Sequence, residues 1–308
     1  MNNHPERGAP TAYLIDASIY IFRAWFSVPD SMRGEGGMPV NAVYGFCRFL
    51  TEFVERSKAS HVVVAFDESL TQSFRNDIYP QYKMNRELAP KELSDQFKLC
   101  RRVAEAAGLH CVAHQRYEAD DLIATAAKRL RESGFRIGIV SGDKDLAQVL
   151  RGHDFWWDFA RDQQLGSAQV VDKFGVPPEA IQDYLGLCGD AVDNIPGVPG
   201  VGPKTASALL QEFGTMDNMY EKLGEIQYLK IRGAKTLAAK LREHQEQAFL
   251  SRQLATVAYD SPIEVTADGV RRCSAEVGSL QQLGQIMGGR GDGLFERLVN
   301  SAQASLVQ

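Results

Sequence analysis

Acidic side chains recur along this chain at positions where several of them could act on one ligand. Three of them, Asp16, Asp67 and Asp143, come at or shortly after apolar runs rich in β-branched residues. Such runs, each followed by a helical pattern, are typical of buried parallel strands, and open α/β sheets bind ligands beyond the carboxyl ends of their strands. The acids that we expect around one crevice are Asp16, Asp67, Glu118, Asp120, Asp121, Asp143, Asp145, Asp190 and Asp193.

A crevice with this many carboxylates indicates bound cations, because the negative charges would otherwise repel one another strongly. Hard divalent ions prefer oxygen ligands, so magnesium or manganese is the expected guest. Magnesium that is held by carboxylates usually has a phosphate as a further ligand. The acids therefore predict metal-assisted phosphate chemistry.

Each acidic motif also has an explanation that needs no metal. The acids of residues 117–121 stand at an expected helix start, where they meet the positive end of the helix dipole. Residues 141–145 could form a strand-to-helix loop in which one aspartate caps the helix. The third motif, residues 189–196, is weak when taken alone. Their joint occurrence in this order, together with acids at two further strand ends, favours one shared site.

The glycine-rich segment 197–205, GVPGVGPKT, nearly matches a phosphate-binding Walker A loop. Pro203 separates Gly202 from Lys204, however, and the segment follows a loop instead of a strand, so we reject nucleoside triphosphate binding. A helix-hairpin-helix turn fits better, because glycines let the backbone approach a DNA phosphate and the next helix N-terminus binds the anion. A plain turn between two helices remains the alternative.

Basic residues are concentrated in two segments, although the formal net charge of the chain is −5. Residues 71–102 hold seven Lys/Arg against four Asp/Glu, and residues 222–242 hold six against one. Basic segments beside a metal-binding crevice suit a nucleic-acid enzyme. In residues 73–86 the cations alternate with aromatic residues, which suits a single strand with stacked bases. A solvated loop whose aromatic residues pack on the core is the other explanation of that segment, and the sequence leaves both open.

Composition favours a cytoplasmic protein without membrane contacts. The five cysteines are scattered and form no C-x-x-C pair, which argues against a disulfide framework and favours a reducing compartment. Residues 1–10 are polar, so we expect a loose tail and no signal peptide. No run of about 18 apolar residues is present. His110 and His114 are four apart on an expected strand, which is not the helical spacing of a zinc site.

The first half of the chain alternates predicted strands and helices. The strands are expected at 13–15, 62–66, 110–113 and 136–140, and the helices at 18–26, 40–57, 91–107 and 118–132. This alternation predicts an α/β fold with a mostly parallel sheet that has helices on both faces. From about residue 167 the pattern changes to short helices separated by Gly and Pro, expected at 169–174, 178–187, 204–213 and 234–255. We find no internal repeat.

In several of these motifs the chain resembles the bacterial 5′ nuclease family of the flap endonuclease superfamily, which includes the N-terminal domain of DNA polymerase I. The matching segments are 14–23 (LIDASIYIFR), 42–46 (AVYGF), 65–67, 74–86 (FRNDIYPQYKMNR), 117–121 (YEADD), 141–146 (SGDKDL) and 189–206 (GDAVDNIPGVPGVGPKTA). The resemblance implies a PIN-like α/β fold with a helical, helix-three-turn-helix DNA-binding subdomain of the helix-hairpin-helix type. It also implies a tail at 1–10, a catalytic domain at 11–166 with a helical gateway at about 71–95, a DNA-binding subdomain at 167–260 and an extension at 261–308 that docks back.

The resemblance implies a role for each matching residue. Two Mg²⁺ or Mn²⁺ ions would be held, the first by Asp16, Asp67, Glu118, Asp120 and Asp143, and the second by Asp121, Asp145, Asp190 and Asp193. The gateway residues expected at the scissile phosphate are Arg75, Lys83 and Arg86, and Tyr79 and Tyr82 are expected to contact DNA. The duplex backbone would be held by Gly200, Gly202, Lys204 and Thr205, and the turn carbonyls could bind K⁺.

The implied activity is that of a structure-specific 5′ nuclease. It would hydrolyse DNA phosphodiesters near 5′ ends and 5′ flaps by a two-metal mechanism, in primer removal or repair, as a monomer and with a DNA polymerase as partner in trans. Two departures stand out, namely Ala17 where the family usually has Gly, and residues 87–90 (ELAP) in place of a Pro-rich run. The alternatives are a non-catalytic binder of branched DNA, which the filled acidic set disfavours, and a PIN-type ribonuclease, which segment 189–206 disfavours.

Overall fold

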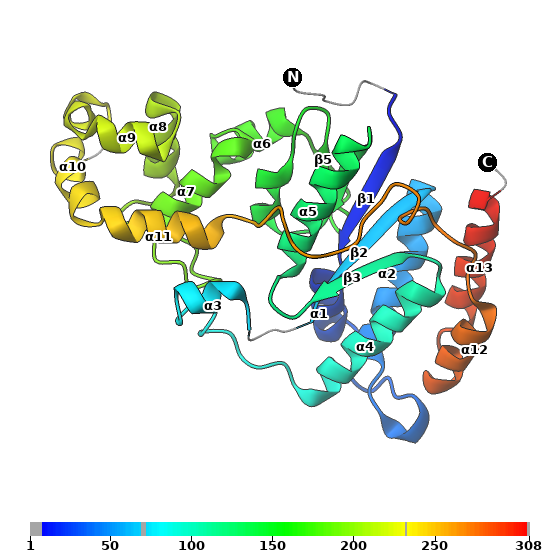
Figure 1. The fold of residues 1–308 in the computed structure, drawn as a ribbon. Coiled ribbons are helices and arrows are strands. Elements are labelled where there is room, and N and C mark those ends of the chain that lie inside the picture. Colours follow the sequence, from blue (N-terminus) through cyan, green and yellow to red (C-terminus); the bar gives the residue numbers. More distant parts are fainter. Residues whose placement is uncertain (1–7, 69–71, 232, 307–308) are drawn as a thin grey trace.

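A six-stranded sheet forms the centre of the protein, in the order β3-β2-β1-β4-β5-β6 (Figure 1). The strands are β1 (Thr11–Asp16), β2 (His61–Asp67), β3 (His110–His114), β4 (Arg136–Val140), β5 (Phe155–Asp158) and β6 (Gln163–Leu165). Strands β1 to β5 run parallel, and β6 pairs antiparallel with β5. The predicted mostly parallel α/β sheet is thereby confirmed.

The computed structural model describes residues 8–68, 72–231 and 233–306. Residues 1–7 of the predicted tail, residue 71 of the predicted gateway and residues 307–308 of the predicted extension lie outside the described residues.

Strands β5 and β6 are not predicted by the sequence pattern. They contain four and three residues, too few for an alternating pattern to be recognised. Every residue of β5 is buried, and Trp156 and Trp157 pack into core clusters on opposite faces of the sheet. The aromatic residues of β5 therefore belong to the core on both faces of the sheet.

The register of the central strands brings their acidic ends to one edge of the sheet. Asp16, the last residue of β1, is paired with Ala65 of β2, and Asp67 ends that neighbouring strand. On the other side of β1 lies β4, which ends at Val140 shortly before Asp143. Because parallel strands share the direction of their carboxyl ends, these three aspartates start from the same edge.

Helices cover both faces of the sheet, because successive side chains of a strand point to opposite sides. Leu14 packs in the cluster that contains α5, whereas Ile15 packs in the cluster that contains α1, α2 and α4. The helices of this half are α1 (Ala17–Ser27), η1 (Glu35–Gly37), α2 (Asn41–Ser57), α3 (Phe74–Ile78), α4 (Lys91–Ala106), α5 (Ala119–Glu132) and η2 (Lys144–Val149).

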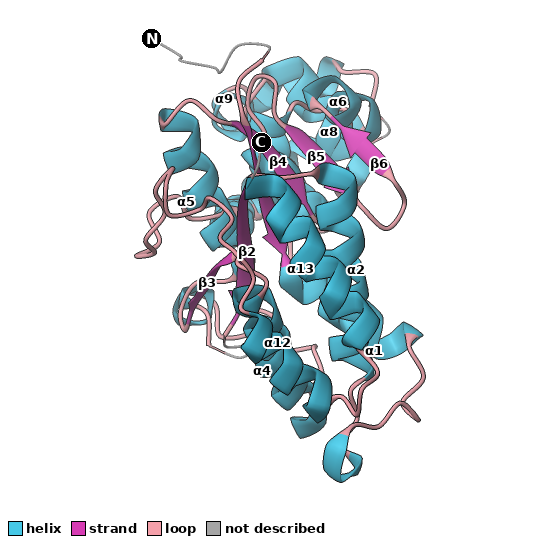
Figure 2. Cartoon of the chain, turned by 90° about the vertical axis from the view of Figure 1, so that its right-hand side faces the viewer, coloured by secondary structure: helices cyan, strands magenta, loops and turns pink. Residues whose placement is uncertain are grey.

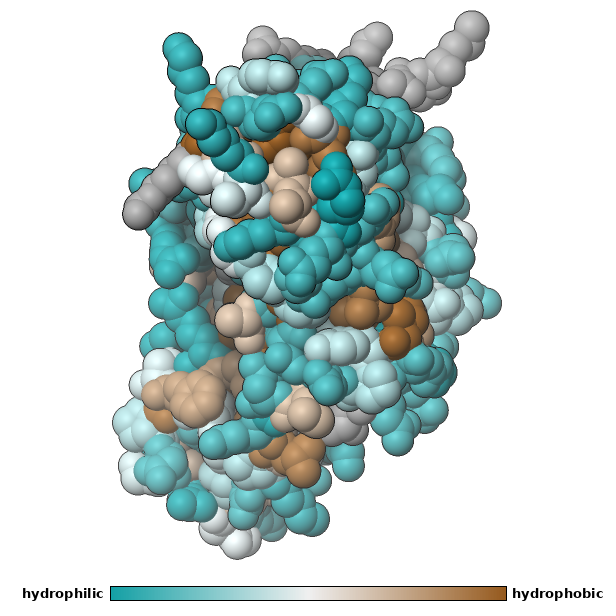
Figure 3. Space-filling view, turned by 90° about the vertical axis from the view of Figure 1, so that its left-hand side faces the viewer, coloured by the Kyte–Doolittle hydropathy of each residue, from teal (hydrophilic) through white to brown (hydrophobic). Residues whose placement is uncertain are grey.

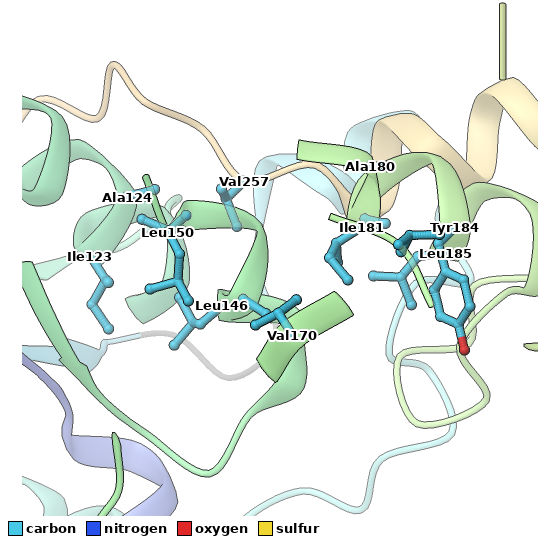
Figure 4. Packing of buried hydrophobic residues seen from close by; sticks show 14 of the residues in the cluster. Ile123, Ala124, Leu146, Leu150, Val170, Ala180, Ile181, Tyr184, Leu185 and Val257 are labelled. Atoms are coloured by element: carbon cyan, nitrogen blue, oxygen red, sulfur yellow. The ribbon is translucent and has the colours of Figure 1, made fainter. Parts of the chain in front are cut away.

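The second half is a group of short helices beside the sheet (Figure 1). They are α6 (Ser167–Phe174), η3 (Pro178–Ala180), α7 (Ile181–Cys188), α8 (Pro203–Phe213), α9 (Met216–Glu221), η4 (Leu223–Tyr228), α10 (Ala234–Glu243) and α11 (Gln245–Ala255). One hydrophobic cluster runs from α5 through η2 to α6 and α7, as Figure 4 shows for Ile123, Leu146, Val170 and Ile181. The two halves thus share a core, which fixes the loops between them.

The helical segment predicted at 234–255 is present as two helices, because the chain leaves the helical conformation at His244 (φ −107°, ψ 24°). The two pieces pack on different partners, α10 on η4 and α11 on α7. A straight helix could not satisfy both contacts, and the helical pattern of the sequence contains no signal for that division.

The C-terminal segment forms α12 (Val277–Ile286) and α13 (Asp292–Leu306). These helices pack against α4 and α2 (Figure 2), on the opposite side of the sheet half from the helical half (Figure 1). Leu280, Leu283, Phe295 and Leu298 complete the core cluster of that face of the sheet. No helix within the described ranges is long and apolar enough to cross a membrane.

Candidate active site

Two strand-end aspartates are held in place by short polar contacts at the carboxyl edge of the sheet. Asp16 is 6% exposed and accepts hydrogen bonds from the backbone N–H of Ser18 (3.1 Å) and the hydroxyl of Ser141 (2.9 Å). Asp67 accepts a hydrogen bond from the backbone N–H of Ala119 (2.8 Å). The ends of β1 and β2, the segment after β4 and the start of α5 are therefore fixed relative to one another.

The charges of four aspartates act on each other at this edge, and we call Asp16, Asp67, Asp120 and Asp143 the edge acids. Burial, together with the neighbouring charges of Asp67 and Asp143, raises the pKa of Asp16 to about 7. Burial also raises the pKa of Asp120 well above its ordinary value, with additional repulsion from Asp143 and Asp16. The predicted convergence of these acids is thus visible in their electrostatics.

Asp145 extends the acidic crevice toward the helical half. Burial raises its pKa to about 7, and the charges of Asp143, Asp190 and Asp193 also act to raise it. Its Oδ1 atom is buried and accepts no hydrogen bond in the described structure, and the ammonium group of Lys144 lies 3.7 Å from it. A buried carboxylate oxygen without a donor is unusual and favours a cation as its partner.

Three other acids, Glu118, Asp190 and Asp193, are paired with side-chain cations, and we call them the paired acids. Lys83 contacts Glu118 (2.5 Å) and lies 3.6 Å from Asp193. Arg86 also pairs with Asp193, and Lys144 pairs with Asp190. Lys144 was missed by the sequence reasoning, although it stands between two of the predicted ligands.

These cations change the acidity of the acids that they contact. Burial opposes ionisation of Glu118, but the charges of Lys83 and Arg75 outweigh it and hold the pKa of Glu118 below its ordinary value. Burial likewise opposes ionisation of Asp190, and the hydrogen bond from Lys144 outweighs it, so that the pKa of Asp190 is lowered. Within residues 8–68, 72–231 and 233–306, no group of three or more His, Cys, Asp and Glu side chains is arranged to hold a metal ion as it stands.

Arg75 and Asp121 form a buried pair that is separate from these groups. Arg75 is 2% exposed, and its guanidinium donates to both carboxylate oxygens of Asp121 at 2.8 Å. It also donates to Glu118 (3.0 Å) and to the backbone oxygens of Leu254 (2.8 Å) and Thr256 (2.9 Å). All five guanidinium N–H groups therefore have an acceptor within the protein.

The carboxylate of Asp121 is equally satisfied. Besides Arg75, it accepts hydrogen bonds from the backbone N–H groups of Glu118 (3.0 Å) and Ala258 (2.8 Å). The pair thereby ties the start of α5 to the segment after α11. The structure leaves neither side chain of the pair a contact to offer a phosphate or a metal ion.

The two tyrosines that were predicted to contact DNA, Tyr79 and Tyr82, each have a hydroxyl partner within the protein. Tyr82 is 4% exposed, and its hydroxyl lies 2.9 Å from Glu118 and 3.2 Å from Asp193. The hydroxyl of Tyr79 donates to the side chain of Gln81 (2.7 Å). Tyr82 is thus a support for Glu118 and Asp193 in this structure, whereas Met84 (71% exposed) and Leu88 (75% exposed) present the apolar surface of the gateway.

The glycine-rich segment forms a tight turn between α7 and α8. Gly197 (φ 60°) and Gly200 (φ 80°) adopt backbone conformations that favour glycine. Val198 and Val201 anchor the turn in the core, while Lys204 is exposed in the first turn of α8. The ammonium group of Lys240 on α10 lies 3.1 Å from the position that a Cβ atom on Gly200 would take. The sequence patterns did not predict this second cation, Lys240, at the turn.

The surface of the helical half is largely hydrophilic, with small separate hydrophobic areas (Figure 3). Tyr228, which is 80% exposed, is the large apolar side chain of η4 that points to solvent. Such a surface suits a polar, charged partner.

Comparison with known proteins agrees with the sheet and with the helical half. The family model "5′-3′ exonuclease, N-terminal resolvase-like domain" matches residues 11–175, and "5′-3′ exonuclease, C-terminal SAM fold" matches residues 176–277. A 5′-3′ exonuclease of Aquifex aeolicus is 33% identical over 272 residues, which are 88% of this chain and 90% of the relative. The chain therefore belongs to the 5′-3′ exonuclease family, whose members are nucleases that act on DNA phosphodiester bonds.

Other relatives are longer proteins. The DNA polymerase I of Rhizobium leguminosarum is 39% identical over 265 residues, which are 84% of this chain but 25% of that protein. A bacteriophage T5 flap endonuclease, solved as a pseudo-enzyme-product complex with DNA and metal ions, has a TM-score of 0.63 and 18% identity and covers 95% of this chain and 99% of its own. That likeness supports the fold.

Proposed function

We propose that this chain is a structure-specific 5′ nuclease that hydrolyses DNA phosphodiesters near 5′ ends and at 5′ flaps with the help of divalent metal ions. The observation that carries the proposal is the meeting of the four edge acids at the carboxyl edge of the sheet, where burial, together with the charges of Asp67 and Asp143, raises the pKa of Asp16 to about 7. Mutual repulsion of this kind is relieved by divalent cations. Primer removal and repair are the processes in which such an activity would serve.

The donor atoms of the crevice fit magnesium or manganese. They are carboxylate oxygens throughout, which is the donor type that hard divalent ions prefer. Asp145 Oδ1, which accepts no hydrogen bond and lies 3.7 Å from the ammonium group of Lys144, adds a further oxygen. We propose the edge acids, Asp145 and the paired acids as the residues that hold two ions. We leave Asp121 out of this set, because Arg75 and two backbone N–H groups use its oxygens.

Bound in the crevice, divalent ions would supply a water of lowered pKa and charge stabilisation for the leaving oxygen. Side chains of the protein would stabilise the phosphate and hold the carboxylates in place. Lys83 and Arg86 would exchange Glu118 and Asp193 for the phosphoryl oxygens of the substrate and stabilise the charge that develops there. Tyr82 would keep its hydrogen bond to Glu118 and hold that carboxylate in place.

The duplex would be bound by the hairpin of the helical half. Gly200 and Gly202 would allow a phosphate to approach the backbone, and Lys204 and Thr205 would contact it at the start of α8. We also propose that backbone carbonyls of this turn bind a K⁺ ion. Tyr79 is proposed as a stacking contact of the gateway, since it is only partly buried.

We further propose that the protein acts as a monomer in the cytoplasm and that a DNA polymerase is its partner in trans. The support for a polymerase partner is the group of relatives named DNA polymerase I, of which this chain matches about a quarter of the length.

Cleavage of a 5′-labelled flap duplex tests the proposal. With Mg²⁺ the wild-type chain is expected to cut at or near the junction, and EDTA is expected to abolish the cutting. A duplex whose flap is RNA separates the deoxyribonuclease from a PIN-type ribonuclease. Tight binding without cutting, in Mg²⁺ and in Mn²⁺, would contradict the proposal and favour a non-catalytic binder of branched DNA.

A further inference from the structure

Two segments that are far apart in the sequence are joined by hydrogen bonds to backbone oxygens. We call residues 81–86 the gateway turn and residues 190–195 the aspartate loop. The side-chain amide of Asn194 donates to the backbone oxygen of Gln81 (2.6 Å), and that of Asn85 donates to the backbone oxygen of Ala191 (2.8 Å). Between them, the backbone N–H of Lys83 donates to the backbone oxygen of Asp193 (3.0 Å). Three hydrogen bonds thus connect the half that contains the sheet with the helical half.

The backbone conformation of both segments is adapted to this junction. Asn194 has φ 55° and Lys83 also has φ 55°, in the left-handed region that residues other than glycine rarely adopt. Asparagine tolerates this region better than most residues. The aspartate loop is closed at its base by two backbone hydrogen bonds between Asp190 and Ile195 (2.9 and 2.8 Å). The loop is therefore a firm support against which the gateway turn can be held.

The two kinds of contact at this junction respond differently to substrate. The ion pairs of Lys83 and Arg86 with Asp193 depend on charge, and a phosphate or a metal ion would compete for both partners. The amide-to-backbone hydrogen bonds of Asn85 and Asn194 carry no net charge. These hydrogen bonds can persist while the side chains of Lys83 and Arg86 turn toward the substrate. They therefore fix the position of the backbone that carries the two cations.

We propose that Asn194 and Asn85 are positioning residues, which clamp the gateway turn to the aspartate loop and so hold Lys83 and Arg86 in reach of the scissile phosphate. This inference rests on the proposed function of the crevice. It assigns a role to two residues that contact neither the edge acids nor the hairpin in the structure.

The variants Asn194→Gly and Asn85→Ala test the clamp. Asn194→Gly retains the positive φ and removes only the amide, and Asn85→Ala removes the second amide. Lys58→Gly is the matched backbone control, since Lys58 is an exposed residue with φ 48° at the end of α2. Asn218→Ala is the matched amide control, since Asn218 donates to the backbone oxygen of Phe213 within the helical half (3.3 Å).

The first readout needs neither metal nor DNA. Amide hydrogen exchange of Lys83 in the full chain is expected to be slow in the wild type and in both controls, and faster in Asn194→Gly and in the double variant. The second readout is single-turnover cleavage of the flap duplex at saturating enzyme with Mg²⁺. We expect the rate of the double variant to fall on the order of 10- to 100-fold, as for displaced catalytic groups, with unchanged affinity for DNA in EDTA.

Normal exchange at Lys83 together with a normal cleavage rate in the double variant would overturn the inference. A loss of DNA affinity equal to the loss of rate would also overturn it, because the two residues would then bind DNA and not position the cations. If the wild type itself fails to cleave, the proposed function fails and the positioning role with it, whereas the exchange data by themselves decide whether the clamp exists. Circular dichroism identifies a variant that does not fold, and the two single variants then carry the test.

Discussion

The edge acids and the paired acids lie in one crevice but differ in how their charge is compensated. Among the edge acids, burial and mutual repulsion raise the pKa values of Asp16 and Asp120. Among the paired acids, nearby lysine and arginine side chains lower the pKa values of Glu118 and Asp190 in spite of burial. Within the described part of the chain no edge acid forms an ion pair with a side-chain cation, whereas each paired acid does.

This difference suggests a division of work. Repelling carboxylates at fixed strand ends favour ions from solution, whereas carboxylates paired with long, movable side chains can release those cations to a phosphate. The buried Arg75–Asp121 pair belongs to neither group, because its contacts are complete within the protein.

Arg75→Ala is expected to destabilise the fold strongly. It leaves the buried carboxylate of Asp121, which is fully inaccessible, without its partner, and loss of one member of a buried pair costs roughly 3–5 kcal/mol. Arg56→Ala is the control, because Arg56 pairs with Asp162 at the surface and such pairs contribute about 0–1 kcal/mol. Urea unfolding measures both. Equal stability of the two variants would show that Arg75 is free for chemistry.

Lys83→Ala is expected to lower the single-turnover cleavage rate by on the order of 10²-fold, as for the loss of one stabilising donor, with a small effect on folding. The reason is that the cation would act mainly when charge develops on the phosphate. Lys128→Ala, on the exposed face of α5, serves as the control. If Lys83→Ala weakened DNA binding and left the rate constant intact, the role of Lys83 would be binding only.

Divalent metal is expected to stabilise the protein more at about pH 8 than at about pH 5.5. The folded-state pKa of Asp16 is raised from 3.8 to about 7, so the folded state holds extra protons between these values and loses stability as the pH rises through them. Mg²⁺ would offset the repulsion of the charged acids above pH 7, by about 2.7 kcal/mol at a concentration 100 times its Kd. Thermal unfolding with Mg²⁺ and with EDTA at both pH values measures this, and an equal shift at both pH values would contradict it.

Lys204→Ala should have the smallest effect, a weaker affinity for duplex DNA with cleavage at saturation nearly intact. It is expected to remove one phosphate contact and thus reduce the slope of log K against log salt by about 1. Fluorescence anisotropy across a salt series measures the slope, again with Lys128→Ala as control. An unchanged slope would show that Lys204, at the start of α8, does not contact a phosphate of the duplex.

The sequence predicted the parts of this site that depend on local pattern. The strands before Asp16, Asp67 and Asp143 are continuous apolar runs, so both the strands and the acids at their ends could be recognised. The glycine and proline residues of segment 197–202 indicate a tight turn. These features are short-range, and the fold retains them.

The parts that could not be predicted depend on contacts between distant segments. The acceptors of Arg75 include backbone oxygens of Leu254 and Thr256, which no pattern around Arg75 indicates. The clamp between Asn194 and Gln81 joins residues 113 positions apart. The division between α10 and α11 likewise follows from their different packing partners.

The most direct test of the crevice is Asp120→Asn, studied by single-turnover cleavage and by binding of the same 5′ flap duplex. Asparagine keeps the size of the side chain and removes the charge that a divalent ion would use. If the edge acids hold divalent ions, the cleavage rate in Mg²⁺ will fall by at least about 10²-fold while the affinity for the flap duplex stays the same. A variant that cleaves as fast as the wild type would show that Asp120 does not take part in binding the catalytic ions.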